Sequence, residues 1–242
     1  MQIYRAILTL LENTYFASRE VGTLYESEPL VGNYALTYGL GLCAAPYDWS
    51  GPPRYKQDLG PLNERGLYVT PATFLPGKLR FAFSQFNAQS DSYYFRFDQN
   101  AIATTPNKRA RAANFPQSGK IRMLGLESQA HFYLFSREGE MPLLPGYIRL
   151  GKFNSKARVE WERLNLLSEQ PREADEELRF FLNAVDLPAS LAGKLRAFSI
   201  YNIYPAPLLS QCRLAGPFWQ ATTAQGERVV LPAGMRYGVD AL

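Results

Sequence analysis

Hydrophobic residues alternate with polar ones along much of this chain, and this period of two predicts strands. In residues 2–11 both alternating sets of positions are largely hydrophobic, which is typical of a central strand covered on both faces. The pattern predicts further strands at 78–86, 92–97, 121–126, 129–137 and 196–204, and short strands near Phe218 and Val229. The strands at 78–86 and 92–97 are rich in aromatic residues and are expected to form a hairpin with its turn at 87–91.

Two segments carry hydrophobic residues at helical spacing instead. The first follows Ser27, whose hydroxyl is typical of a helix N-cap, and continues to Leu42. The second spans 172–185 and has acidic residues near its start, where the helix dipole favours them. Its hydrophobic stripe consists of Ala174, Leu178, Phe181, Leu182 and Val185. This order of strands and helices predicts an α+β fold of the ferredoxin-like type.

Two irregular stretches interrupt the regular pattern. Residues 46–77 are rich in proline and glycine, with a strand expected near 67–70, and residues 100–119 are polar and rich in turn-forming residues. Long irregular segments in a compact domain usually serve a function or contact a partner. We therefore expect one domain over 1–242, with insertions at 46–77 and 100–119.

The distribution of charge along the chain is more informative than the net charge. The chain has 242 residues, is 46% hydrophobic and 20% charged, and carries a net charge of +4, which is only a weak indication of a polyanionic partner. Acidic residues gather in 160–177, whereas 108–122 and 149–158 contain only basic ones. This segregation predicts a basic groove on one face of the molecule.

The most informative segment is 146–161. Four basic residues lie within ten positions with no acid among them: Arg149, Lys152, Lys156 and Arg158. Gly151 lets the backbone approach a ligand closely, and Tyr147 and Phe153 offer rings for base stacking. The segment is therefore interpreted as a strand, a phosphate-facing turn and a second strand at 157–161, which favours nucleic-acid binding. The alternative is a solvated basic turn without a ligand.

A second basic cluster lies in the 100–119 insertion. Lys108, Arg109 and Arg111 belong to a polar, turn-rich loop, and Lys120 and Arg122 follow it. Such a loop is exposed and becomes ordered on binding a polyanion, or it is simply solvated and has no function.

The usual enzyme and cofactor motifs are absent from the sequence. It has no glycine-rich phosphate loop and no cluster of His and Cys with zinc-ligand spacing, so neither a metal nor a cofactor is expected. His131, the single histidine, is expected to be a packed and hydrogen-bonded strand residue. The remaining enzymatic option is metal-free RNA cleavage, in which the RNA 2′-hydroxyl attacks and His131 acts with a tyrosine and a lysine.

The cysteines and the hydropathy of the chain indicate where in the cell the protein is expected. Cys43 and Cys212 lie in apolar contexts and are expected to be buried free thiols, as suits a reducing cytoplasm. The chain has no apolar run long enough for a membrane span and no secretion leader at its start. A cytoplasmic protein without membrane contact is expected.

Several short motifs carry a resemblance to a known family. They lie at 4–10, 15–20, 24–29, 33–36, 147–153 and 155–156. In these residues the chain resembles the Cas-five-family subunit of type I-D CRISPR effector complexes, within the RAMP superfamily. The resemblance covers essentially the whole chain and is clearest in the first 45 residues and at 146–161.

The resemblance implies both a fold and a role. The fold is a ferredoxin-like (RRM-like) core with a thumb-like extension, for which 46–77 and 100–119 are both candidates. The role is to cap the 5′ handle of the guide RNA (crRNA) in the Cascade complex. Implied partners are the Cascade backbone and large subunits and target DNA near the protospacer-adjacent motif. One branch of the family cleaves precursor crRNA with a Tyr, Lys and His set, but type I-D resembles the majority, which leave cleavage to a separate ribonuclease.

The sequence thus predicts a set of RNA-binding residues and no catalytic ones. Phosphate contacts are expected from Arg149, Lys152, Lys156, Arg158, Lys108, Arg109 and Arg111. Base stacking is expected from Tyr15, Phe16, Tyr147 and Phe153, and Arg19 completes the set. Two rival hypotheses remain open: a metal-independent endoribonuclease that processes precursor crRNA, and a structural adaptor whose basic segments meet acidic protein surfaces.

Overall fold

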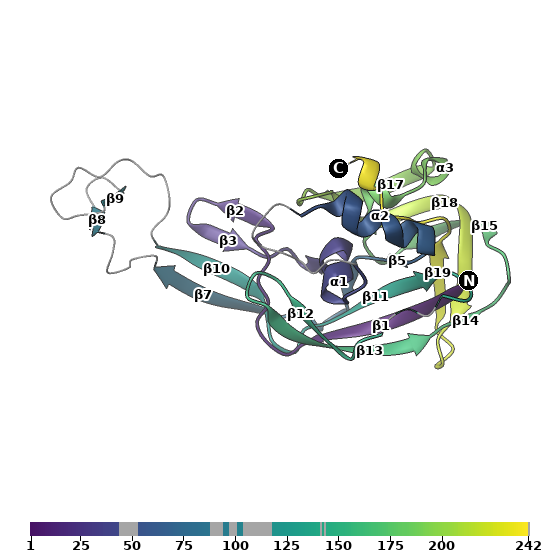
Figure 1. The fold of residues 1–242 in the computed structure, drawn as a ribbon, viewed down its shortest axis with the longest axis horizontal. Helices are drawn as coiled ribbons and strands as arrows, with labels where there is room; N and C mark the ends of the chain where they lie inside the picture. The colour runs from purple at the N-terminus through teal and green to yellow at the C-terminus, as the bar shows by residue number, and fades with distance from the viewer. Residues whose placement is uncertain are drawn as a thin grey trace.

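The computed structural model describes residues 1–43, 53–87, 94–96, 101–103, 118–140, 142 and 144–241. The fold is mixed α/β, with many strands and few helices. Figure 1 shows a main sheet with two helices beside it, a C-terminal sheet next to the main sheet, and a third sheet that projects away from this body. One hydrophobic core joins the main sheet and the C-terminal sheet, and its buried residues come from along the whole chain, from Ile3 to Val239.

The main sheet has seven strands in the order β12-β13-β1-β11-β6-β4, with β5 also paired to β11. The strands are β1 (Gln2–Leu10), β4 (Leu30–Val31), β5 (Tyr68–Val69), β6 (Ala72–Phe74), β11 (Gln129–Ser136), β12 (Tyr147–Leu150) and β13 (Ser155–Arg163). As predicted, β1 is a central strand, since it pairs with β11 on one side and β13 on the other. Ile3 and Leu8, on opposite faces of β1, are both fully buried.

Helices α1 (Asn33–Gly39) and α2 (Tyr55–Arg65) contribute Leu36, Leu59 and Leu62 to the core. The predicted helix from Ser27 to Leu42 was too long, because Leu30–Val31 form β4. Ser27 does not cap it either: its hydroxyl hydrogen-bonds the backbone of Phe16.

The described part of the 46–77 insertion is ordered into α2, β5 and β6, packed within the body. The prediction of a long irregular stretch was wrong there, although the strand expected near 67–70 is confirmed as β5. Buried Leu59 and Tyr68 fix this part of the insertion to the core, and residues 46–52 lie outside the described residues.

The C-terminal sheet is built around one long strand, β18, of 15 residues. Its strands are β14 (Asn165–Leu166), β15 (Arg172–Leu178), β16 (Leu182–Asn183), β17 (Leu195–Tyr201), β18 (Leu208–Thr222) and β19 (Arg228–Pro232). Short helices η1 (Ala184–Asp186), α3 (Ala189–Ala192) and η2 (Val239–Ala241) complete this half. The strands expected at 196–204 and near Phe218 and Val229 are confirmed as β17, β18 and β19.

The helix predicted over 172–185 is wrong. Residues Arg172–Leu178 form β15, which pairs antiparallel with β18 from Phe218 to Cys212. Asp175 is held by Arg213 and Arg196, each at 3.1 Å. Asp175, one of the acidic residues that suggested a helix N-terminus, therefore faces arginines on other strands. Pairing of β15 with β18 along its whole length, rather than local helix propensity, sets the conformation of this segment.

The projecting sheet has the order β2-β3-β10-β7 and lies at the left of Figure 1. Its strands are β2 (Arg19–Val21), β3 (Leu24–Glu26), β7 (Phe81–Asn87) and β10 (Ser118–Leu124). A separate pair consists of β8 (Tyr94–Arg96) and β9 (Ala101–Ala103). The predicted hairpin between 78–86 and 92–97 is wrong, because β7 pairs with β10 and β8 pairs with β9.

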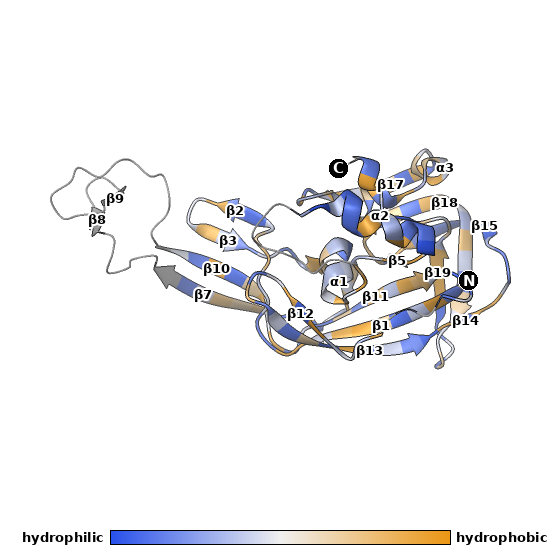
Figure 2. Ribbon diagram, in the orientation of Figure 1, coloured by the Kyte–Doolittle hydropathy of each residue, from blue (hydrophilic) through white to orange (hydrophobic). Residues whose placement is uncertain are grey.

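The distribution of hydrophobic and hydrophilic residues agrees with this arrangement of sheets and helices. Figure 2 shows hydrophobic residues concentrated along parts of β1 and β11, whereas much of α2 is hydrophilic. No helix in the described ranges is long and apolar enough to cross a membrane. The sequence predicted an α+β fold of the ferredoxin-like type; the mixture of helices and strands is confirmed, while the ferredoxin-like connectivity stays a prediction.

Candidate nucleic-acid interface

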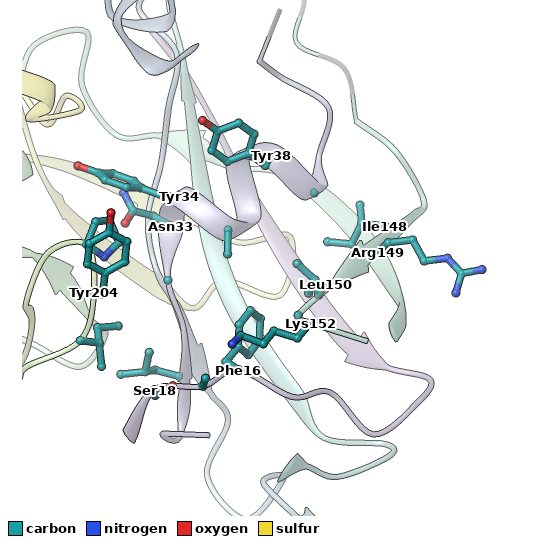
Figure 3. Close-up of a pocket in the computed structure, with 18 of the residues that line it drawn as sticks. Phe16, Ser18, Asn33, Tyr34, Tyr38, Ile148, Arg149, Leu150, Lys152 and Tyr204 are labelled. Carbon is teal, nitrogen blue, oxygen red and sulfur yellow. The ribbon is translucent and has the colours of Figure 1, made fainter. Parts of the chain in front are cut away.

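A cleft of about 1150 Å³ opens between the β12–β13 hairpin, α1, the segment 16–18 and the segment 203–208 (Figure 3). Phe16 and Lys152 point into it from one side and Tyr204 lies on the other, whereas Arg149 points away from it. Helix α1 packs closely on the hairpin beside the cleft, since a Cβ atom at Gly39 would lie 3.0 Å from the Arg149 carbonyl oxygen.

One face of the β12–β13 hairpin gathers four of the predicted residues. Tyr147 lies opposite Arg158 and Arg149 lies opposite Lys156, and directly opposed residues of an antiparallel pair share a face. The Lys156 ammonium lies 4.6 Å from the centroid of the Tyr147 ring, a cation–π contact. The strand–turn–strand arrangement predicted for this segment is confirmed. Three of its cations, Arg149, Lys156 and Arg158, form one surface, whereas Lys152 lies in the turn.

The hairpin tip is held against the segment that leads from β1 to β2. Gly151 has a φ of 71°, which lets the Lys152 N–H donate to the Tyr15 carbonyl at 2.8 Å. Phe153 is 55% exposed, and its ring lies 5.2 Å from that of Tyr15. Tyr15 itself is buried, so its ring packs against Phe153 and has little free surface for a base; base stacking by Tyr15 stays a prediction that this burial disfavours.

Acidic residues partly neutralise the hairpin face. Arg149 lies 3.8 Å from Glu12 and Arg158 lies 3.2 Å from Glu160. Exposed ion pairs of this kind contribute about 0–1 kcal/mol, so a phosphate group can compete for the arginines. No carboxylate within the described residues lies within 4 Å of the ammonium of Lys152 or Lys156.

The structure separates the remaining predicted residues from the hairpin face. Phe16 lines the cleft, with its backbone N–H and carbonyl both bonded to the Ser27 hydroxyl at 2.9 and 3.0 Å. Arg19 lies instead on β2 of the projecting sheet, 3.6 Å from Glu26. Lys108, Arg109 and Arg111 lie outside the described residues.

Sequence reasoning missed the aromatic wall of the cleft. Tyr204 is 81% exposed, and its ring lies 6.4 Å from that of Tyr55. Tyr34 and Tyr38 line the same wall. Both were interpreted only as the hydrophobic face of a helix, and the one available signal for Tyr204 was its place in a proline-rich segment, 204–207.

His131 lies on β11, opposite Ile7 and away from the cleft lining. Its Nδ1 is buried without a hydrogen-bond partner, and its ring packs edge-on against Tyr133. Burial, together with the nearby Arg5 charge, lowers the pKa of His131 to about 4. The predicted packed strand position is confirmed, but the predicted hydrogen bond is not made by Nδ1.

Both cysteines are free thiols; Cys212 is buried and Cys43 half-buried. Burial raises the pKa of Cys43 to about 12 and that of Cys212 to about 11, so each thiol is protonated at neutral pH and a poor nucleophile. Within the described ranges, no group of three His, Cys, Asp or Glu side chains is placed to hold a metal ion.

Comparison with protein families decides where the chain belongs. The family model described as type I-D CRISPR-associated protein Cas5/Csc1 matches residues 1–240. The chain belongs to this family. The resemblance found in the sequence motifs is thereby confirmed, and the chain is a type I-D CRISPR effector subunit. No curated protein matches it.

A solved structure similar to this Cas5/Csc1-family chain is a chain of the cryo-EM structure of Type III-B Cmr-beta bound to cognate target RNA and AMPPnP. The two share 10% sequence identity with a TM-score of 0.44, and the match covers 87% of this chain and 86% of the other.

Replacing Gly151 with alanine is expected to destabilise this Cas5/Csc1-family chain by about 3 kcal/mol. A left-handed φ costs a non-glycine residue roughly 1–2 kcal/mol, and the new methyl group would lie 2.5 Å from the Tyr15 carbonyl oxygen. Urea unfolding of both proteins measures the difference. Gly22→Ala is the matched control, because Gly22 also has a positive φ but open space around it. Equal losses in the two variants would show that the tip contact contributes nothing.

Proposed function

We propose that this chain is a non-catalytic RNA-binding subunit of a type I-D CRISPR Cascade complex, and that it caps the 5′ handle of the crRNA. The observation that carries the proposal is the hairpin beside the cleft, with cations on one face and exposed rings at its tip and edge. Family membership supplies the CRISPR context, and the hairpin supplies the chemistry for holding a single RNA strand.

The hairpin offers both kinds of contact that single-stranded RNA uses. Arg149, Lys156 and Arg158 point from one rigid two-stranded face, where they can position phosphates without reading sequence. Tyr147 and Phe153 are exposed beside them, and a base stacked on an aromatic ring contributes about 1–3 kcal/mol. The cleft next to them is large enough to take a base splayed out of the strand, which is how single-stranded RNA is usually recognised.

Binding without cleavage is the second part of the proposal. The pKa of His131, about 4, makes its imidazole a weak base, and the residue lies on β11 outside the cleft lining. A general base needs to reach the 2′-hydroxyl of the RNA. We therefore place guide-RNA processing in another protein and this chain in RNA capture.

The proposed partners follow from the family. They are the crRNA handle, the Cascade backbone and large subunits, and target DNA near the protospacer-adjacent motif, in the cytoplasm. The projecting sheet supports contact with neighbours, because it reaches away from the body. The guide sequence itself is read by base pairing elsewhere in such a complex.

The test is assembly with crRNA at several salt concentrations. A triple variant with Arg149, Lys152 and Lys156 changed to alanine is co-expressed with the other complex subunits and a repeat-spacer array, and protection of the crRNA 5′ end is measured. Each lost phosphate contact lowers the salt slope of log K by about 0.7, so we expect the slope to fall by about 2 and the 5′ end to become exposed.

The control variant removes the same charge elsewhere. It changes Lys78, Arg179 and Lys194 to alanine; these side chains are exposed and lie outside the cleft. Equal 5′-end protection in both triple variants would contradict the proposal. If the subunit dissociates equally in both while the RNA end of retained complexes stays protected, the chain is an adaptor.

The endoribonuclease rival has its own readout. Precursor crRNA is incubated with the purified complex containing either the natural chain or His131→Phe. We expect identical processing by both. Loss of cleavage in the variant, with RNA binding unchanged, would make this chain the nuclease.

A further inference from the structure

The C-terminal sheet ends in two edge strands of opposite character. Residues Arg213 and Leu214 of β18 pair with β15 on one side and with β17 on the other. Within the described residues neither β15 nor β17 pairs with a further strand. Five of the seven residues of β15 are charged, whereas Arg196 is the one charged residue among the seven of β17. Charged side chains keep an edge strand from pairing with another chain, so β15 is protected in this way and β17 is not.

The unprotected strand also exposes hydrophobic side chains. All residues from 196 to 200 are exposed, including Phe198 at 45% and Ile200 at 60%. Half-buried Tyr201 fixes the end of the strand, because its ring packs edge-on against that of Phe181, with 5.1 Å between the centroids. An ordered, apolar strand with a free edge is a template to which a strand of another chain can add.

The single charge of β17 is neutralised within its own sheet. The Arg196 guanidinium lies 3.1 Å from the Asp175 carboxylate on β15, across β18. Arg196 is also the extra residue of a β-bulge, since Leu195 and Ala197 pair with adjacent residues of β18. From Ala197 to Tyr201 the strand carries no charge and no extra residue, so this stretch is able to form a second ladder along its other side.

The stretch 197–201 is complementary to itself in an antiparallel pairing. About a twofold axis at Ser199, Phe198 of one copy lies opposite Ile200 of the other, and the reciprocal pair forms at the same time. Aromatic and β-branched residues make favourable cross-strand pairs, and no like charges are opposed in this register. Because both copies use the same residues, the contact closes as a dimer and does not continue into a fibre.

We propose that two copies of the free chain pair along β17 and join their C-terminal sheets into one continuous sheet. The ladder is short, so the interface lies at the low end of the size range for protein–protein contacts, below about 1,200 Å², which suits a reversible dimer. This inference goes beyond the proposed function and does not depend on it, because no RNA takes part. Pairing covers the apolar edge of β17 while the subunit is outside its complex. Ile203 and Tyr204 follow β17 directly and line the cleft, so the paired strands lie beside the cleft.

Sedimentation equilibrium of the purified, RNA-free, full-length chain tests the pairing. Between about 1 and 100 µM chain we expect the average mass to rise from 27.3 kDa toward twice that value. Changing Phe198 and Ile200 together to lysine sets like charges opposite each other twice, and is expected to weaken dimerisation at least about tenfold. The control changes Val21 and Leu167 to lysine, which adds the same charge at two other exposed apolar positions, and is expected to dimerise like the natural chain. Equal far-UV circular dichroism spectra establish that the variants are folded.

Two further variants test the register of the pairing. Phe198→Glu combined with Ile200→Lys places opposite charges across the twofold axis, and this variant is expected to dimerise at least about fivefold more tightly than the double-lysine variant. Mild oxidation of Ser199→Cys is expected to give a disulfide-linked dimer, because position 199 of one copy lies opposite position 199 of the other. Leu167→Cys is the control, and it is expected to run as a monomer on a denaturing gel without reductant.

Three results would overturn the inference. The first is a natural chain that keeps the mass of one copy over the whole concentration range. The second is a dimer that the double-lysine change leaves intact, and the third is a Ser199→Cys variant that cross-links no more than Leu167→Cys. If the natural chain is monomeric and the double-lysine variant is lost from the purified effector complex, another subunit occupies the edge of β17 and pairing with a second copy is excluded.

Discussion

Replacing Asp186 with alanine is expected to lower the free energy of unfolding by about 4 kcal/mol. The Asp186 carboxylate is almost fully buried and accepts four hydrogen bonds. The donors are the Asn33 amide (2.7 Å), the Tyr34 hydroxyl (3.0 Å), the Tyr68 hydroxyl (3.1 Å) and the Gly238 backbone N–H (2.8 Å). Without the carboxylate these buried donors lose their acceptor, at a cost of roughly 1–3 kcal/mol each before relaxation.

This carboxylate joins parts of the chain that are far apart in sequence. Asn33 and Tyr34 belong to α1, Tyr68 to β5, and Gly238 to the C-terminal segment. Asn33 and Tyr34 also line the cleft, so the same network that holds the two halves together shapes the proposed binding site. A loss of stability in Asp186→Ala is therefore expected to be accompanied by weaker RNA binding.

Urea unfolding followed by circular dichroism measures the effect. Asp240→Ala is the control, because the Asp240 carboxylate is exposed and pairs with Lys56 at 2.8 Å; exposed ion pairs contribute little, so a much smaller loss is expected. Asp186→Asn keeps one acceptor oxygen and is expected to lose about half as much as alanine. A loss below about 1 kcal/mol in Asp186→Ala would show that these hydrogen bonds add nothing net.

Acidification from pH 6.5 to 4 is expected to destabilise the natural chain by roughly 3 kcal/mol more than it destabilises His131→Phe. The folded pKa of His131 is about 4, below its ordinary value of 6.5, because the imidazolium would be buried near Arg5. Between these values the unfolded chain binds more protons than the folded chain. The stability contributed by neutral His131 is therefore complete above pH 6.5 and is lost as the pH falls toward 4.

The difference between the two proteins isolates this effect. His131 is the only histidine, so carboxyl groups account for the acid dependence that remains in the variant. Among them Asp186 acts with the opposite sign, since burial raises its pKa to about 6 and it favours the folded state as it protonates below that pH. Unfolding free energies of the natural chain and His131→Phe at intervals from pH 7 to 4 provide the comparison. Parallel curves would contradict the expected burial of a neutral histidine.

The sequence predicted the hairpin at 147–163 well because its determinants are local. A glycine with positive φ at Gly151 and alternation on both sides set the turn and the faces of the strands. The alternation alone places Arg149, Lys156 and Arg158 on one side. The sequence could not tell that Tyr15 would be buried beneath Phe153, since that contact depends on where the tip docks.

The errors lie where partners are distant in sequence. Residues 172–178 were predicted to be helical because acids at a helix start and apolar residues at helical spacing are both favourable locally. Their strand conformation is set by β18, about 40 residues away, through a ladder and the pairs with Arg196 and Arg213. Glycine and proline in 46–77 suggested a loop, yet the burial of Leu59 and Tyr68 against the body orders it.

By itself the sequence determined the central strand, the basic hairpin and the family to which this chain belongs. Each of these depends on a short segment with a recognisable hydrophobic periodicity, charge pattern or motif. Only the tertiary structure decided which residues meet. It placed Tyr204 across the cleft from Phe16, moved Arg19 to the projecting sheet, and kept His131 away from the cleft lining. The physical reason is that strand pairing and core packing join residues distant in the chain, and neither periodicity nor local propensity records those partners.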